Sequence, residues 1–240
     1  RLRHCWIRTK RFTIFLPAIA TGTDKPTDAE TEGSASFFCE RKVAMSPSPF
    51  FALISRTKYI NRWGLMRGTE TENLQEHSYE TAILAHALAT IDRNERGVEV
   101  DPDRAAVMAL YHDVSEILTG DMPTPVKYYN EEIRTSYRRI ERRAVEALAE
   151  KLPDYLRDDY WQLMNAERAP EWKYVKAADT LSGYLKCLKE RKAGSEEFAG
   201  AEASLRERLV ETDVPALDDF LRDFLPAYTQ TLDEQTKDLL

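Results

Sequence analysis

After Met45, apolar residues recur along the chain at intervals of three and four, and short polar or proline-containing connections separate the apolar runs. This spacing is typical of amphipathic helices. The pattern predicts helices over residues 49–59, 73–92, 102–119, 130–152, 152–164, 171–191, 196–211 and 214–232. The predicted fold class is therefore all-α, with residues 45–240 forming a helical bundle.

The predicted helix over residues 102–119 is apolar on two sides. Asp101 is placed to cap its first turn, and Gly120 is placed to end it. One face carries Val107, Leu110, Tyr111, Val114, Ile117 and Leu118, and the opposite face carries Ala105, Met108, Ala109 and His112. A helix of this kind lies inside a bundle rather than on its surface. We therefore expect both faces to be buried.

Ionisable side chains gather at the carboxyl end of this helix. His112 and Asp113 are adjacent, and Glu116 shares their face because it follows them by four and three residues. Asp121 stands in the loop just beyond Gly120. Buried ionisable groups are costly unless a partner or a metal ion compensates them. This cost is the first physical argument for a functional site in residues 111–125.

Two further candidates lie on the inward faces of other predicted helices. His77 is in line with the apolar stripe of residues 73–92, and Asp179 lies beside the stripe of residues 171–191. A lone histidine on an apolar face is more often a core residue than a ligand. Asp179 has an alternative role as the salt-bridge partner of Lys176. Both side chains become credible ligands only in combination with His112 and Asp113.

The combination is two imidazoles, His77 and His112, and two carboxylates, Asp113 and Asp179, on three helices. Two nitrogen and two oxygen ligands suit one divalent transition metal ion such as Co, Mn, Fe, Ni or Zn. Such a site leaves positions for water and for a substrate oxygen.

The composition excludes several classes of protein. The 240 residues carry a net charge of -7, which argues against binding to a nucleic-acid polymer. No stretch approaches the roughly 20 apolar residues of a membrane span, so we expect no membrane association. The three cysteines are widely spaced and form no C-x-x-C motif, which favours a reducing, cytoplasmic compartment.

Residues 1–44 differ in composition from the rest of the chain. They carry eight Lys and Arg against five Asp and Glu, and residues 21–36 are rich in Thr, Ser, Gly and acidic residues. We predict a mostly unstructured N-terminal extension. Its basic and then apolar opening leaves two interpretations, a targeting segment or non-native sequence ahead of a true start at Met45.

The order His, His-Asp, Asp resembles the HD-domain metal-dependent phosphohydrolases. The stretches INRWGLMR, TENLQEHS, YHDVSEILTGDMPTPVKY and VKAADTLSGYLKCL are similar to the bacterial HD-domain 5'-deoxynucleotidases in particular. The similarity covers nearly all of residues 45–240 and none of residues 1–44. It implies an all-helical homodimer that hydrolyses deoxyribonucleoside 5'-monophosphates to a deoxyribonucleoside and phosphate.

The resemblance also implies roles for individual residues. The metal ligands would be His77, His112, Asp113 and Asp179, the catalytic carboxyl groups Glu116 and Asp121, and the substrate contacts Arg62, Trp63 and Thr124. In this interpretation Glu116 positions or deprotonates the attacking water, and Asp121 protonates the leaving 5'-oxygen. The two roles can be exchanged. Arg62 would hold the phosphate, and the Arg-Trp pair would favour a sugar without a 2'-hydroxyl.

Two other functions fit the same residues. The first is an HD hydrolase of nucleoside triphosphates or phosphodiesters. The second is a catalytically silent, nucleotide-binding or scaffold protein that keeps a metal ion for stability. Glu116 and Asp121 argue against the second, because a structural metal site is closed by its ligands and has no need of further carboxyl groups.

Overall fold

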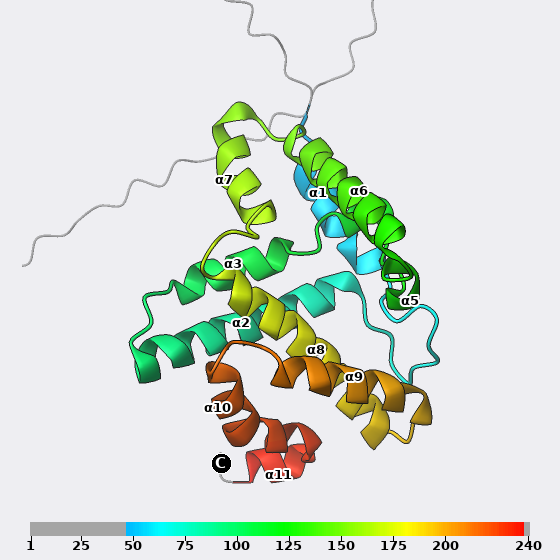
Figure 1. The fold of residues 1–240 in the computed structure, drawn as a ribbon, viewed down its shortest axis with the longest axis vertical. Coiled ribbons are helices and arrows are strands. Elements are labelled where there is room, and N and C mark those ends of the chain that lie inside the picture. The colour runs from blue at the N-terminus through cyan, green and yellow to red at the C-terminus, as the bar shows by residue number, and fades with distance from the viewer. Residues whose placement is uncertain (1–46, 238–240) are drawn as a thin grey trace, which may run out of the picture. The chain divides into compact units, whose positions relative to one another are not determined.

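The computed structural model describes residues 47–237, and the regular secondary structure in this range is helical. The α-helices are α1 (Phe50–Ile54), α2 (Leu74–Arg96), α3 (Pro102–Tyr111), α4 (Glu116–Thr119), α5 (Thr124–Lys127), α6 (Glu131–Ala149), α7 (Asp154–Met164), α8 (Trp172–Lys192), α9 (Ala199–Val210), α10 (Ala216–Asp223) and α11 (Leu232–Thr236) (Figure 1). Three 3-10 helices are η1 (Ser55–Tyr59), η2 (Glu196–Phe198) and η3 (Leu225–Thr229). The predicted all-α fold class is confirmed. The predictions for residues 1–44 lie outside the described range.

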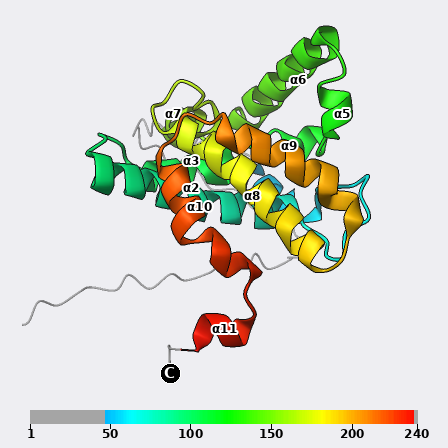
Figure 2. The ribbon, with the colours of Figure 1, turned by 60° about the horizontal axis from the view of Figure 1, so that its bottom comes forward.

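Helices α2, α3 and α8 form the centre of the bundle. Helix α3 packs along α2, and α8 crosses both, as Figures 1 and 2 show from two directions. Their contact is made by small and aliphatic side chains that are fully buried, among them Ala85, Leu88, Ala105, Met108, Ala109, Ala178, Leu181 and Leu185. Small residues let the helix backbones approach closely, and this brings polar side chains on the same faces together.

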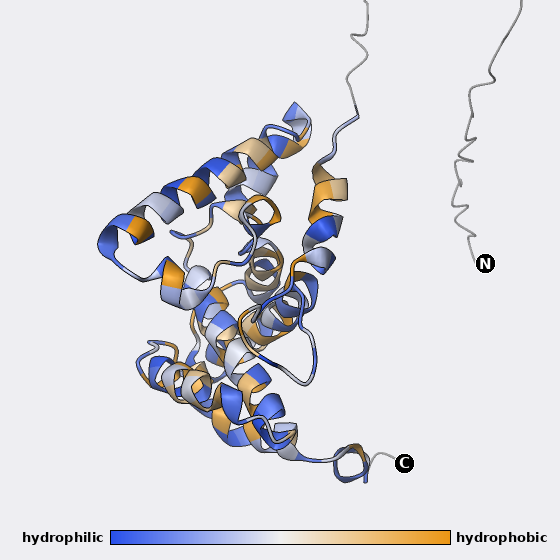
Figure 3. Ribbon diagram, turned by 90° about the vertical axis from the view of Figure 1, so that its right-hand side faces the viewer, coloured by the Kyte–Doolittle hydropathy of each residue, from blue (hydrophilic) through white to orange (hydrophobic). Residues whose placement is uncertain are grey.

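A second apolar cluster supports the chain just after α3. Phe50 of α1 and Val114 are buried with Leu148 of α6 and Met164 of α7. Val114 is adjacent to Asp113, so this cluster fixes the backbone beside one of the candidate ligands. The helices themselves carry apolar and polar residues on different sides, which gives the alternating orange and blue bands in Figure 3.

The amino end of α2 is fixed by a capping box. The Asn73 side chain accepts hydrogen bonds from the backbone N–H groups of Gln75 and Glu76, and the Glu76 side chain accepts one from the Asn73 N–H. These bonds satisfy donors that a helix terminus otherwise leaves unpaired. At its other end α2 extends to Arg96, beyond the predicted residue 92, and stops at Gly97, whose φ of 65° is in the left-handed region.

The prediction of one continuous helix over residues 102–119 is wrong. Helix α3 ends at Tyr111, and the next four residues turn through i to i−3 hydrogen bonds, such as Val114 N–H to Tyr111 O at 3.2 Å and Glu116 N–H to Asp113 O at 3.0 Å. Helix α4 then runs only to Thr119. The tighter winding changes the directions in which the side chains after Tyr111 point.

The prediction that both faces of this segment are buried is also wrong. Ala105, Met108 and Ala109 are fully buried, but Val107 and Leu110 are 39% and 47% exposed. Helices α2 and α8 approach α3 closely on the side of its small residues, and this explains why that face is the buried one. The larger aliphatic side chains of α3 are left at the surface.

The carboxyl-terminal part departs from prediction in one further respect. The single helix predicted over residues 214–232 is divided into α10, η3 and α11. Pro226 lies at the start of η3, where its ring is compatible with a new helical turn but not with continuation of α10. Helix α5 was not predicted. No helix among residues 47–237 is long and apolar enough to cross a membrane.

Candidate metal centre and active site

Four side chains predicted as metal ligands meet at one point of the bundle. They are His77 of α2, His112 and Asp113 after α3, and Asp179 of α8. One ligand atom from each lies within 4.8 Å of the ligand atoms of the other three. Helices α2, α3 and α8 pack together at the core, so the convergence follows from the packing of these three helices.

The distances within this cluster fit a shared ion. His77 Nε2 lies 3.3 Å from Asp179 Oδ1 and 3.8 Å from Asp113 Oδ2. His112 Nε2 lies 3.0 Å from Asp113 Oδ2 and 3.9 Å from Asp179 Oδ1. Ligand atoms bonded at about 2.1 Å to a single ion are separated by roughly 3 to 4 Å.

Both imidazoles present an unpaired nitrogen to the centre of the cluster. His77 Nε2 and His112 Nε2 are buried and make no hydrogen bond to any of the described residues. Buried polar atoms in native proteins are nearly always paired, and a bound ion is one explanation when they are not. The His112 ring is held by its other nitrogen, because Nδ1 lies 2.7 Å from Ala109 O and donates to it. In the neutral ring the lone pair is therefore on Nε2, so the residues present fit a divalent metal ion that takes the place of a proton there.

Burial and neighbouring charges shift the pKa values of the cluster residues in different directions. Burial lowers the pKa of His77, and the positive charge of Arg62 lowers it further. Burial acts in the same direction on His112, but the carboxylates of Asp113 and Asp179 outweigh it and raise the pKa of His112 to about 10. Burial opposes ionisation of Asp113, yet the neighbouring His112 holds its pKa below the usual range. A cation is thus favoured at this position.

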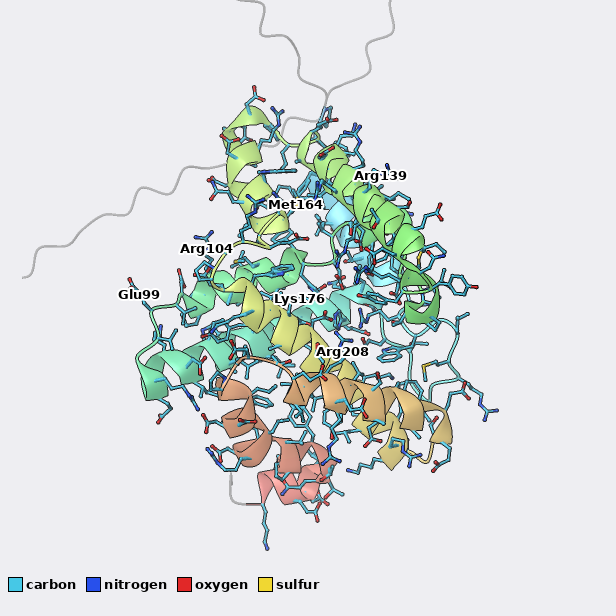
Figure 4. All side chains as sticks on the ribbon, in the orientation of Figure 1. Glu99, Arg104, Arg139, Met164, Lys176 and Arg208 are labelled. Atoms are coloured by element: carbon cyan, nitrogen blue, oxygen red, sulfur yellow. The ribbon has the colours of Figure 1, made fainter. Side chains whose placement is uncertain are left out.

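Asp179 lies in the ligand cluster and also forms the ion pair with Lys176 that the sequence suggested. Its Oδ1 faces the two imidazoles, and its Oδ2 accepts a hydrogen bond of 2.7 Å from Lys176 Nζ. Lys176 extends from α8 one turn before Asp179 (Figure 4). Burial would raise the pKa of Asp179, but Lys176 and the imidazoles hold it well below the usual range.

Glu116 and Asp121 lie near the cluster, and the charge of Asp113 acts on both of them. Glu116 is 5% exposed, and its Oε2 has no hydrogen-bond partner within residues 47–237. Burial raises the pKa of Glu116 to about 9, and the charges of Asp113 and Asp121 act in the same direction. Burial also raises the pKa of Asp121, against the lowering effect of Arg62. Neighbouring carboxyl groups whose pKa values are both raised are suited to acid–base chemistry.

Arg62 points toward the same cluster from the loop between η1 and α2. Its Nε donates to Glu72 Oε1 at 2.8 Å, and its Nη1 lies 3.7 Å from Asp113 Oδ2. The ends of this loop are held together by a backbone hydrogen bond from the Arg62 N–H to Glu72 O and by an antiparallel β-bridge between Asn61 and Asn73. One edge of the guanidinium is thus anchored, and the other remains directed at the cluster.

Trp63 has a backbone conformation that is unusual for a side chain of its size. Its φ is 59°, in the left-handed region, which costs on the order of 1 kcal/mol for a residue other than glycine. The indole packs against Phe198, with ring centroids 5.5 Å apart. Its Nε1 is buried without a hydrogen-bond partner in the described part of the chain. Strain and an unpaired donor occur together at the residue after Arg62.

Thr124, the remaining predicted substrate residue, and three charged residues complete the surroundings. Thr124 is exposed at the first residue of α5. Lys127, at the end of α5, lowers the pKa values of Glu116 and Asp121 by its charge. Glu72 holds Arg62, and Lys176 holds Asp179. No periodicity in the sequence singles out Lys127 or Glu72, whereas the Lys176–Asp179 pair was expected from its spacing within one helix.

The cluster is reached from the surface on two sides. A pocket of about 480 Å³ is lined in part by Asp113, Tyr79 and Leu110. A second pocket of about 390 Å³ is lined in part by His77 and Glu72. The Asp113 and Asp179 side chains are 23% and 19% exposed, so the cluster itself is in contact with solvent.

The helical arrangement is similar to solved structures of HD-domain proteins. An HD-domain phosphohydrolase from Listeria innocua superposes with a TM-score of 0.66 at 22% identity, covering 78% of this chain and 90% of that chain. A cyanophage S-2L HD phosphohydrolase, solved bound to dA and one catalytic Zn²⁺ ion, gives a TM-score of 0.55 at 23% identity and covers 75% and 96%. The fold is thus that of the HD-domain proteins.

Related sequences identify the family to which the chain belongs. A 5'-deoxynucleotidase from Erwinia tasmaniensis is 46% identical over 198 residues, which are 82% of this chain and 100% of the relative. A 5'-deoxynucleotidase from Klebsiella pneumoniae is 45% identical over 196 residues, or 81% and 98%. The family model described as 5'-deoxynucleotidase YfbR-like matches residues 49–228. The chain belongs to this YfbR-like family of 5'-deoxynucleotidases.

Proposed function

We propose that this protein is a metal-dependent phosphomonoesterase that hydrolyses deoxyribonucleoside 5'-monophosphates to deoxyribonucleosides and phosphate. In this proposal His77, His112, Asp113 and Asp179 hold one divalent transition metal ion. The observation that carries it is the pair of buried imidazole Nε2 atoms, which lack hydrogen bonds and face two carboxylates. The membership in a family of 5'-deoxynucleotidases supplies the substrate class.

In the proposed reaction the ion and the side chains around it have separate roles. A divalent ion, when bound, supplies charge neutralisation at the phosphate and acidifies a nearby water. Glu116 positions or deprotonates the water that attacks phosphorus. Asp121, with its raised pKa, gives a proton to the departing 5'-oxygen. Glu116 also has a raised pKa, so the reverse assignment is the alternative.

Arg62 and Trp63 bind the nucleotide in this proposal. The outer edge of the Arg62 guanidinium donates hydrogen bonds to the phosphate oxygens in a forked arrangement, because Glu72 already fixes Nε. The strained backbone of Trp63 holds the indole between the loop and Phe198, where it borders the sugar. Thr124 is a third substrate contact. A rigid aromatic wall next to the sugar would discriminate against a 2'-hydroxyl by steric exclusion and by leaving that hydroxyl unpaired.

A panel of nucleotides tests the proposed function. The purified protein is incubated with Mn²⁺ or Co²⁺ and with deoxyribo- and ribonucleoside mono-, di- and triphosphates, and free phosphate is measured. Release from deoxyribonucleoside monophosphates, with little release from ribonucleotides, is the expected result. Preferential release from triphosphates would replace this function by the first alternative. No release from any substrate would indicate a binding or scaffold protein.

We also propose that two copies associate through one apolar face of α2 and α3. Tyr79 and Leu110 line one pocket, and His86 of α2 lies 3.3 Å from Asp103 of α3, so the outer sides of these helices run alongside each other. Between these two points the face carries the exposed side chains of Ile83 and Val107. Exposed apolar groups in one continuous strip are typical of an interface. A homodimer in the cytoplasm is the state we propose.

A further inference from the structure

The second nitrogen of His77 contacts a serine from another helix. His77 Nδ1 lies 3.2 Å from Ser182 Oγ, and both side chains are completely buried. Ser182 belongs to α8 and follows Asp179 by three residues. The serine is therefore placed between the candidate ligand from α2 and the helix that supplies the candidate ligand Asp179.

The serine hydroxyl is already engaged on its other side. Ser182 Oγ donates a hydrogen bond of 2.9 Å to Glu80 Oε2, and Glu80 Oε1 accepts one of 3.0 Å from Lys189 Nζ. An ionised carboxylate only accepts hydrogen bonds, and a serine hydroxyl has a single proton to donate. The Ser182 proton is thus directed at Glu80, and the oxygen has only lone pairs to offer His77.

This direction of donation decides the tautomer of His77. Only a protonated Nδ1 can make a favourable contact with the lone pairs of Ser182 Oγ. The other carboxylate near this nitrogen, Glu72 Oε1, is 3.8 Å away, which is too long for a hydrogen bond. In the neutral ring a proton on Nδ1 leaves Nε2 as the acceptor, and Nε2 is the atom that faces Asp113 and Asp179.

We propose that Glu80 and Ser182 form a positioning relay that fixes His77 as the Nδ1–H tautomer and orients its Nε2 for metal binding. The relay rests on the proposed function for its purpose, but its geometry stands on its own. Neither residue touches substrate or the reacting atoms, so both are positioning residues. Hydrogen bonds of this kind behind a metal-bound imidazole fix the ring and raise ligand affinity.

The relay continues to the surface through Lys189. The Lys189 and Glu80 side chains are 48% and 27% exposed, whereas Ser182 and His77 are enclosed. Lys189 donates to Glu80 Oε1 and leaves Oε2 to accept the Ser182 proton, so the hydroxyl hydrogen points away from His77. His112 needs no such relay, because a backbone carbonyl, Ala109 O, holds its Nδ1. The two imidazoles are oriented by different means toward one point.

The first test reads the tautomer directly in the metal-free protein. Long-range ¹H–¹⁵N correlation spectra of ¹⁵N-labelled protein distinguish a protonated from an unprotonated imidazole nitrogen, and the chain has only four histidines to assign. The expected spectrum shows His77 protonated at Nδ1 and unprotonated at Nε2. A His77 that carries its proton on Nε2 would overturn the proposal, whatever the activity of the enzyme.

The second test measures Mn²⁺ binding by titration calorimetry in variants of the full chain. Ser182→Ala is expected to weaken binding by about 10- to 100-fold, the effect typical of losing a hydrogen bond behind a metal ligand. Glu80→Ala should act in the same direction. Glu80→Gln should bind closer to the parent, because an amide oxygen still accepts the Ser182 proton.

Ser78→Ala is the matched control for Ser182→Ala. Ser78 is also buried and is adjacent to His77 in sequence, but its hydroxyl donates to Leu74 O within its own helix. It should bind Mn²⁺ as the parent does, and thermal unfolding of each variant checks that the fold is intact. Parent-like Mn²⁺ affinity in a folded Ser182→Ala protein would overturn the relay.

The outcomes separate the relay from the proposed function. If the parent releases phosphate from deoxyribonucleoside monophosphates and Ser182→Ala binds Mn²⁺ normally, the relay is wrong and the function stands. If the tautomer and the affinity losses are as expected but no nucleotide is hydrolysed, the relay stands and the function is wrong.

Discussion

At the scale of single residues, Glu116 is the side chain whose protonation bears most directly on catalysis. It is buried beside the ligand cluster, one of its oxygens is unpaired, and its pKa is raised to about 9. Glu116→Gln keeps the shape of the side chain but removes its acid–base function. We expect kcat to fall by about 10² or more, with metal content unchanged. Turnover is measured as phosphate release and metal content by atomic absorption.

Glu146, a partly exposed ion-pair residue on α6, provides the control for this substitution, since Glu146→Gln should leave kcat unchanged. Near-full turnover of Glu116→Gln with normal metal content would remove Glu116 from the mechanism. Comparing the pH profiles of Glu116→Gln and Asp121→Asn assigns the two roles, because each variant loses the limb of the profile that its own group controls.

Arg62 offers a second test at this scale. A lysine keeps the positive charge but cannot bind Glu72 and a phosphate with one planar fork. Arg62→Lys is expected to reduce kcat/KM for deoxyribonucleoside monophosphates by roughly 10- to 100-fold, the equivalent of one lost charged hydrogen bond. Arg67→Lys, on the exposed part of the same loop, is the control. Equal kcat/KM values for the two variants would contradict the phosphate role of Arg62.

The residue types of the candidate site were predictable, and several of their partners were not. His77, His112, Asp113 and Asp179 stand out because ionisable groups on apolar helical faces need compensation. Ser182 and Glu72 act only through contacts with residues distant in the chain, and no local pattern marks them. Lys176 was foreseen as a rival explanation for Asp179, and its ion pair coexists with the place of Asp179 in the cluster.

At the scale of elements, the loop that carries Arg62 and Trp63 is anchored to the end of α8 by a buried carboxylate. Glu190 is 1% exposed, and its oxygens accept hydrogen bonds from Thr69 N–H, Thr69 Oγ1, Glu70 N–H and Lys186 Nζ. Burial alone would raise the pKa of Glu190, but these donors outweigh burial and lower it to about 2. The ionised form therefore stabilises the position of the loop.

The sign of this shift predicts a pH dependence of stability. A carboxyl group with a lowered pKa contributes stability that is fully present above its ordinary value of 4.5 and is lost as the pH falls toward 2. Glu190→Gln should unfold more easily than the parent at neutral pH, by about 3 kcal/mol, because Lys186 loses its charge partner. The difference should shrink between pH 4.5 and 2.

Urea unfolding at a series of pH values measures this difference. Glu197→Gln, at an exposed glutamate near the same end of α8, should follow the parent at every pH. A difference between Glu190→Gln and the parent that is as large at pH 2.5 as at pH 7 would show that ionisation of Glu190 contributes no stability.

The helices themselves were predictable from periodicity, and the break after α3 was not. Apolar spacing continues through residues 111–118, so the sequence indicates one helix there. The observed i to i−3 turns place Val114 in the second apolar cluster and Asp113 against the imidazoles at the same time. A continuous helix and the observed turn differ in how this segment packs against α1, α6 and α7, and only that packing distinguishes them. Tertiary packing also decides that α3 buries the face with its small residues.

At the scale of the whole molecule, the exposed strip on α2 and α3 predicts association of two copies. Ile83→Asp places a charge in the middle of this strip, where desolvation would oppose association. In light scattering the parent should have twice the chain mass of 27.7 kDa, and the variant should have the mass of one chain. Val210→Asp, at an equally apolar and 82% exposed position on α9, should remain dimeric. A parent that is already a single chain would refute the strip as an interface.

The account depends most on the claim that segments from α2, from the turn after α3 and from α8 bind one ion. An anomalous-difference map from crystals grown with Mn²⁺ tests it most directly. The account predicts a single peak within bonding distance of His77 Nε2, His112 Nε2 and the carboxylates of Asp113 and Asp179. A map with no peak there, or with Mn²⁺ bound only elsewhere on the chain, would contradict it.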